Sequence, residues 1–145
     1  IFSTAWQESC FQQFKVKKGK ITYLRSYNKT SIGLMQVNER VWRGIYNLKH
    51  LKWNIRYNAM AGGEIIDLYF QRYALKKLKI KGPIDSDTLA GVTYAMYNGG
   101  PRHFYQFLKR KEQGKYYLSD RLFFKKYRWV QNDQWAYIDD CLVGW

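Results

Sequence analysis

The sequence is poor in the residues that interrupt helices or bind metals. Among its 145 residues are 2 prolines, 2 cysteines and 2 histidines. Because no C-x-x-C spacing occurs and the histidines have no ligand-like spacing, we expect neither a metal site nor another cofactor. No apolar run approaches the roughly 20 residues that a membrane-spanning helix needs, so no membrane span is expected.

Acidic residues are also scarce, and this gives the chain a strong positive charge. It has 11 Asp and Glu against 25 Lys and Arg, for a net charge of +14. Such a surface attracts polyanions: nucleic acid, anionic lipid or the carboxylate-bearing polymers of a bacterial wall. A solvated basic face without any partner is the alternative.

The chain has ample material for a packed core. Hydrophobic residues make up 46%, with 6 Trp, 13 Tyr and 8 Phe. This length and composition predict one globular domain over residues 1–145, and the start at Ile1 indicates a trimmed or mature fragment. Cys10 and Cys141 form either a disulfide or two buried thiols.

The hydrophobic pattern predicts an all-α domain, because strand-like alternation is scarce. Helices are expected over residues 2–12, 33–46, 54–78 and 87–98, after Pro101, and within 119–142. Residues 13–32 read as a basic loop with at most a short hairpin around residues 21–24. The 33–46 helix would present one apolar face, and the 54–78 helix would bury another. These faces comprise Leu34, Val37, Val41 and Ile45, and Ile55, Ala59, Ile66 and Phe70.

Glu8 is the first candidate for chemistry. It lies near the end of an apolar helix, within Ala5-Trp6-Gln7-Glu8-Ser9-Cys10-Phe11, and is the only acid in the first 38 residues. Glycosidic cleavage needs a carboxylic acid that stays protonated near neutral pH, and an apolar setting favours this form. A lone helical Glu is more commonly a solvated surface residue, so the assignment of Glu8 as a catalytic acid depends on the neighbouring segments.

Three segments together resemble the signature of a known family. They are Gln7-Glu8-Ser9, Ser31-Ile32-Gly33-Leu34-Met35-Gln36-Val37 and Tyr97-Asn98-Gly99-Gly100-Pro101. In order and spacing they are similar to the soluble-type lytic transglycosylases (SLT domains), of the glycosidase family that also contains the goose-type lysozymes. The resemblance covers about residues 1–110 and implies a lysozyme-like helical domain that cleaves peptidoglycan glycan strands.

The resemblance assigns roles to individual residues. Glu8 matches the catalytic glutamate, and Met35 and Gln36 match positions lining the cleft beside the scissile bond. Tyr97 and Asn98 match a pair whose tyrosine lies near the glutamate and whose asparagine holds the substrate. Two serines, Ser26 and Ser31, compete for a contact with the N-acetyl group of the sugar. For Met35 and Tyr97, simple packing is the alternative. A later Asn-Ile pair and glycine, Asn54-Ile55 and Gly62, also match, and close helix packing explains that glycine.

The sequence also departs from the family pattern. Between Phe14 and Ile32 it has a basic loop where many relatives have a shorter turn, and this loop adjoins the expected sugar subsites. Its six basic residues are Lys15, Lys17, Lys18, Lys20, Arg25 and Lys29.

The number and positions of the Asp and Glu residues favour a transglycosylase over a hydrolase. Hydrolysis needs a second carboxylate to activate water or act as nucleophile. Goose-type lysozymes have Asp directly after the G-L-M-Q-V segment, where this chain has Asn38. The next acid, Glu39, should point away from Met35 and Gln36 if a helix begins near Gly33. The expected product is therefore a 1,6-anhydro-muramyl end formed by cleavage of the MurNAc-GlcNAc β-1,4 bond. A goose-type-like lysozyme that uses Glu64 is the alternative.

Two alternative function classes are a non-catalytic peptidoglycan-binding module and a nucleic-acid-binding protein. A non-catalytic peptidoglycan-binding module would lose the acid, whereas Glu8 is present. A nucleic-acid binder would combine the basic residues with stacking aromatics such as Tyr23, Tyr27 and Trp42, but none of the common nucleic-acid motifs occurs. Peptidoglycan is the expected partner, and the resemblance implies a periplasmic or cell-envelope location.

Overall fold

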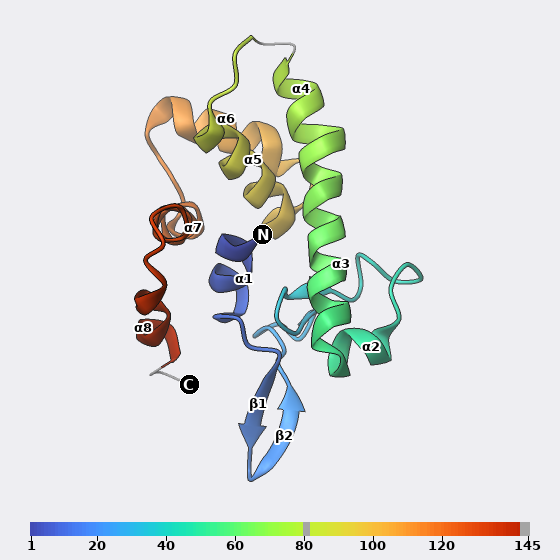
Figure 1. Ribbon diagram of the computed structural model, residues 1–145. Coiled ribbons are helices and arrows are strands. Elements are labelled where there is room, and N and C mark those ends of the chain that lie inside the picture. The colour runs from blue at the N-terminus through green and yellow to red at the C-terminus, as the bar shows by residue number, and fades with distance from the viewer. Residues whose placement is uncertain (80–81, 143–145) are drawn as a thin grey trace. The chain divides into compact units, whose positions relative to one another are not determined.

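In the computed structural model, which describes residues 1–79 and 82–142, most of the chain is helical and two small antiparallel sheets are present (Figure 1). The expected helical class is confirmed, but the fold is not purely all-α: a short hairpin was expected within residues 13–32, whereas the second sheet was not. The chain forms two compact units, Ile1–Gly63 with the chain from Trp129 onward, and Glu64–Arg128. A single domain over 1–145 stays a prediction. Among the described residues, no helix has the length and apolar character needed to cross a membrane.

Helix α1, Phe2–Ser9, is packed against the C-terminal segment of the chain within the first unit. The Trp6 ring is buried and lies 5.2 Å from the ring of Trp129 and 5.9 Å from that of Trp135. Burial of such large rings contributes strongly to folding. Trp135 begins a short helix, η2 (Trp135–Ile138), which α8 (Asp139–Leu142) follows.

The end of α1 is fixed by backbone conformation and by a covalent bond. The helix ends at Ser9, earlier than expected, because Cys10 and Phe11 have left-handed φ values of 56° and 60°. Cys10 forms a disulfide with Cys141, with their Cα atoms 6.1 Å apart. Of the two states considered for these cysteines, the structure contains the disulfide.

Residues 13–32 contain the expected hairpin, which is longer than predicted. Strands β1 (Phe14–Lys17) and β2 (Lys20–Tyr23) are antiparallel and pair Lys15 with Thr22 and Val16 with Ile21 (Figure 1). Lys18 and Gly19 form the turn with φ values of 50° and 71°, as two-residue hairpin turns require. Alternation along the strands puts lysines on one face and apolar side chains on the other.

The prediction of a helix over residues 33–46 is wrong. A turn at residues 33–36 joins strands β3 (Ser31–Ile32) and β4 (Val37–Asn38), and further turns follow. Gly33 and Gln36 have φ values of 73° and 47°, which a right-handed helix does not allow. Val41 and Ile45, expected on a buried face, are each 65% exposed.

The helix expected over residues 54–78 is present, but it buries a different face. Helix α2 (Leu48–Trp53) precedes α3 (Ile55–Leu68), which continues into the π-helix η1 (Tyr69–Leu75) and α4 (Lys76–Lys79). Ile55 is half exposed, and Ala59, Ile66 and Phe70 are partly exposed. The buried positions instead include Asn58, Ala61, Ile65, Tyr69, Ala74 and Leu78. The five-residue step from Tyr69 to Ala74 arises because the π-helix adds a residue to the turn.

The second unit contains helices α5 (Ser86–Gly99), α6 (His103–Gln113) and α7 (Leu118–Gln131), the last of which runs past the end of the unit. The α5 helix confirms the prediction for residues 87–98, and helices are present after Pro101 and within 119–142. The backbone N–H of Thr88 donates to the N-cap Asp85, while Gly100 ends the helix with a φ of 86°. Where Gly91 lacks a Cβ, the Phe107 ring approaches α5 closely.

Candidate active site

Glu8 lies in the last turn of α1 and its side chain is half-buried. The following residue, Ser9, is buried and joins α1 to the G-L-M-Q segment. Its Oγ donates to the backbone oxygen of Leu34 at 2.5 Å and lies 3.3 Å from that of Ala5. The backbone at Glu8 is therefore held beside the turn that contains Met35 and Gln36.

The turn at residues 33–36 is closed by its own glutamine. The Gln36 side-chain Nε2 donates to the backbone oxygen of Gly33 at 2.7 Å, and its backbone N–H donates to the same oxygen at 3.0 Å. The expected cleft residue Gln36 thus uses one amide hydrogen to shape the turn, and its half-buried side chain belongs to the same unit as Glu8.

Two buried amide side chains hold the turn against the rest of the first unit. The Gln13 Oε1 accepts from the Leu34 N–H at 2.8 Å, while its Nε2 donates to the backbone oxygens of Leu51 and Lys52. On the other side, the Asn58 Oδ1 accepts from the Met35 N–H at 2.8 Å.

The Nδ2 of Asn58 completes this arrangement by donating to the backbone oxygens of Ile32 and Leu51 at 2.9 and 3.0 Å. Gln13 and Asn58 thereby satisfy backbone groups of the turn, of β3 and of the C-terminal end of α2 (Leu48–Trp53). Sequence reasoning missed both residues, because a single buried amide gives no periodic signal and its partners are distant in sequence.

Two glycines permit the close packing of this region. A Cβ on Gly33 would lie 2.3 Å from the Gln13 Oε1 and 2.5 Å from the Asn58 Nδ2. A Cβ on Gly62 would lie 2.4 Å from the Met35 Cβ, so α3 approaches the turn only because this residue is glycine. Close packing, the explanation given for Gly62 from the sequence, matches its surroundings.

The Met35 side chain is fully enclosed, with 0% exposure. Its contact with Gly62 and its burial favour the packing interpretation. A role of Met35 in lining the substrate cleft stays a prediction, and it requires the surrounding side chains to move when substrate binds.

The two candidate serines have different surroundings. Ser26 is bound into its own loop, where its Oγ donates to the Asn28 Oδ1 at 2.7 Å and accepts from the N–H groups of Thr30 and Ser31. Ser31 is half-buried in β3, opposite Asn38 of β4. The Ser26 hydroxyl thus shapes its own loop and also lines a groove with Tyr23 and Tyr27, and the choice between Ser26 and Ser31 for a sugar contact stays a prediction.

Glu39, the second acid of the first 63 residues, is held by an arginine. The Arg25 Nη2 lies 2.5 Å from the Glu39 Oε1, and the two side chains are 30% and 18% exposed. The helix expected to turn Glu39 away from Met35 is absent, and this ion pair determines its environment instead.

Tyr97 and Asn98 lie near the end of α5, in the second unit, whereas Glu8, both serines, Met35 and Gln36 belong to the first. Tyr97 is half-buried and Asn98 is exposed. Their approach to Glu8 stays a prediction. The glycine after them has a local explanation, because a Cβ on Gly99 would lie 2.4 Å from the His103 Nε2.

The arrangement in the first unit can support acid-base chemistry at one carboxyl group. It contains a half-buried glutamate at a helix end, a turn held by buried amides, and a neighbouring acid engaged by arginine. The described residues include no group of three or more His, Cys, Asp or Glu suited to a metal ion. Comparison with protein-family models, curated proteins and solved structures finds no match to the chain.

Proposed function

We propose that the chain is a lytic transglycosylase domain that cleaves the MurNAc-GlcNAc β-1,4 bond of peptidoglycan and leaves 1,6-anhydro-muramyl ends. The observation that carries the proposal is the junction of the Glu8 segment with the G-L-M-Q turn. The hydrogen bond from Ser9 to Leu34 makes neighbours of two segments that resemble the family signature and lie far apart in sequence.

In the proposed reaction, Glu8 acts first as the acid and then as the base. Its carboxyl proton passes to the bridging oxygen as the glycosidic bond breaks, and the N-acetyl group of the substrate assists departure. The Glu8 carboxylate next takes the proton of the 6-hydroxyl group. The oxygen of that hydroxyl bonds to the anomeric carbon. Because this nucleophile is part of the substrate, no second carboxylate is needed to activate water.

The environment of Glu39 supports this route over hydrolysis. The two acids in residues 1–63 are Glu8 and Glu39. The Arg25 guanidinium group forms an ion pair with the Glu39 carboxylate, and separating a partly buried charge from its partner costs free energy. Glu39 is therefore a poor candidate for a second catalytic carboxylate. Asn38 cannot act as a base, and its Oδ1 accepts from the N–H groups of Arg40 and Val41.

The basic hairpin supports an anionic polymer as the partner. A groove of about 450 Å³ is lined by cations and hydroxyl-bearing side chains of the hairpin and of the loop that follows it. The cationic members are Lys15, Lys17, Arg25 and Lys29. The peptide stems of peptidoglycan supply carboxylates for such a surface, and Tyr23 and Tyr27 offer rings to sugars. The proposed envelope or periplasmic location suits the disulfide between Cys10 and Cys141, since disulfides persist in oxidising compartments.

Substitution of the proposed acid tests the function. Glu8→Gln removes the transferable proton and is expected to lower the rate of peptidoglycan cleavage by ~10²–10⁴. Glu39→Gln is the control, because it removes a carboxylate of the same unit but no catalytic proton, and its rate should stay within about tenfold of the wild type. Circular dichroism checks that both variants fold. A folded Glu8→Gln variant with the activity of the wild type would refute the assignment.

A further inference from the structure

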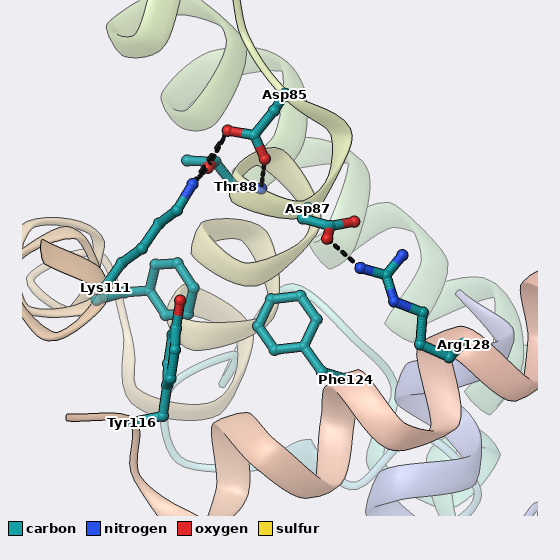
Figure 2. A pocket seen from close by; sticks show the side chains of 8 residues that line it. Asp85, Asp87, Thr88, Lys111, Tyr116, Phe124 and Arg128 are labelled. Atoms are coloured by element: carbon teal, nitrogen blue, oxygen red, sulfur yellow. Dashed lines mark hydrogen bonds and ion pairs between the residues drawn. The ribbon is translucent and has the colours of Figure 1, made fainter. Parts of the chain in front are cut away.

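The second unit contains a cavity of about 300 Å³ that shares no residue with the candidate active site. It lies at the N-terminal end of α5, and its other walls come from α6, α7 and the loop between them (Figure 2). Every lining residue belongs to Glu64–Arg128. Ligand pockets combine an apolar surface with a few convergent polar groups, and this cavity has both.

The apolar part of the cavity consists of three aromatic rings. Phe107 of α6 lies 5.9 Å from Tyr116 and 6.2 Å from Phe124, measured between ring centroids, and Tyr116 and Phe124 are 6.1 Å apart. Rings at mutual distances near 6 Å pack against one another, and because Phe107 is buried, the partly exposed Tyr116 and Phe124 rings form the apolar wall of the cavity.

The polar part consists of two ion pairs. The Lys111 Nζ lies 3.0 Å from the Asp85 Oδ2, and Arg128 is paired with Asp87. Figure 2 shows the Lys111 and Arg128 side chains reaching these aspartates from opposite sides, with the Phe124 ring near the middle of the view. Both aspartates come from the start of α5, while the cations come from α6 and α7. The cavity therefore offers both signs of charge beside the rings.

These ion pairs are open to exchange with a ligand. The side chains of Lys111 and Asp85 are 39% and 59% exposed, and those of Arg128 and Asp87 are 51% and 37% exposed. Exposed pairs of this kind are individually weak, so a charged ligand can replace one partner at little cost. Asp85 would keep its orientation, because Thr88 also donates to it through its hydroxyl and its backbone N–H.

We propose that this cavity binds a small zwitterion with an apolar side chain, of the class of the free apolar α-amino acids. The partly exposed rings of Tyr116 and Phe124, packed on the buried Phe107 ring, receive the side chain. The ammonium group of the ligand binds Asp85, and its carboxylate binds the guanidinium group of Arg128, whose donors match a carboxylate. The two cations and two anions of the lining balance, so a polyanion would meet two aspartates as well as two cations.

The test is a titration of the whole chain with free L-phenylalanine, followed by two-dimensional ¹H–¹⁵N NMR. The signals of residues 85–88 and 107–111 are expected to shift saturably, with a Kd near or below about 5 mM, while those of the hairpin at 14–23 stay unchanged. Two analogues with one charge each, 3-phenylpropionate and phenethylamine, are expected to bind about tenfold more weakly.

Two variants separate the two charge contacts. Arg128→Gln is expected to weaken phenylalanine binding about tenfold, because it removes the carboxylate partner. Asp85→Asn is expected to do the same for the ammonium contact, and asparagine still caps the helix, so the fold is preserved. Arg121→Gln on α7 and Lys109→Gln on α6 are the matched controls, since both residues are exposed and neither lines the cavity.

Three results would overturn the proposal. The first is the absence of saturable shifts in the wild type. The second is 3-phenylpropionate binding as tightly as phenylalanine, which would make the cavity a simple anion site. The third is equal weakening by the control substitutions, which would attribute binding to overall charge. Cleavage of peptidoglycan enters none of these measurements.

Discussion

Replacement of Asn58 by alanine is expected to destabilise the protein severely, because this side chain is 0% exposed and bonds three backbone groups. The Leu51 oxygen would retain a second donor, the Gln13 Nε2 at 2.8 Å. The Met35 N–H and the Ile32 oxygen would lose the partner that Asn58 supplies. Each buried backbone group left without a partner costs ~1–3 kcal/mol, so the expected loss is ~2–6 kcal/mol. A typical domain is stable by ~5–15 kcal/mol, so this loss is a large fraction of the total.

The assay is urea unfolding followed by far-ultraviolet circular dichroism, with Asn54→Ala as the matched control. Asn54 is an exposed asparagine one turn earlier, whose Oδ1 accepts from the Tyr57 N–H at 2.9 Å and which is expected to contribute about 1 kcal/mol as a helix cap. If Asn58→Ala were no less stable than Asn54→Ala, the bonds of Asn58 would not hold the turn. The Asn58→Asp variant refines the test, since it keeps the acceptor for Met35 but loses the two donors.

Three further predictions concern the disulfide, the hairpin and the cap of α5. Reduction of the bond between Cys10 and Cys141, or its removal by substituting both with serine, is expected to lower the free energy of unfolding by ~2–5 kcal/mol, and an unchanged melting temperature would contradict this. Neutralising the groove lysines, Lys15, Lys17 and Lys29, is expected to weaken binding to whole peptidoglycan at low salt. The difference from the wild type should shrink as salt screens the charges. Neutralising an equal number of exposed lysines on α4 and α6 should leave binding unchanged. The hydroxyl and N–H of Thr88 lower the pKa of Asp85 from its ordinary 3.8 to about 2, so the stability that this carboxylate supplies is present above pH 3.8 and is lost as the pH falls through 2. An Asp85→Asn variant should lack this component, and acid unfolding curves identical to the wild type would contradict the assignment.

Local signals in the sequence predicted helix α5 of the second unit well. The α5 helix was predictable because its cap at Asp85 and its end at Gly99-Gly100-Pro101 lie next to the helix itself. The hairpin was predictable only in outline, because the turn at Lys18-Gly19 places a non-glycine residue at positive φ. The exposed apolar residues Val16 and Ile21 gave no clear sign of a buried face.

The segment from Gly33 to Tyr46 misled the prediction because its apolar spacing imitates a helix. Its conformation is set instead by distant side chains, Gln13 and Asn58, which bond the backbone at Leu34 and Met35. Spacing along the chain carries no information about such bonds. Long-range packing also explains why the buried face of α3 differs from the predicted one, because Gly62 rather than an apolar side chain contacts Met35.

The sequence predicted which residues belong to the candidate site but not how they are arranged. The resemblance supplied Glu8 and the G-L-M-Q segment, and Ser9 gives them a physical connection. Gln13 and Asn58 were missed because a buried polar residue is recognised by its partners, which only a structure supplies. The pairing of Arg25 with Glu39 was missed for the same reason.

The central claim is tested most directly by the chemistry of the product. Purified peptidoglycan is digested with the whole chain, and the released fragments are analysed by mass spectrometry beside those of a digest with a hydrolytic lysozyme. Intramolecular closure predicts muramyl ends lighter by one water molecule than the hydrolytic product, and Glu8→Gln should abolish their release. Reducing muramyl ends as the main product would contradict the transglycosylase assignment, and Glu64→Gln would then test the second carboxylate that hydrolysis requires.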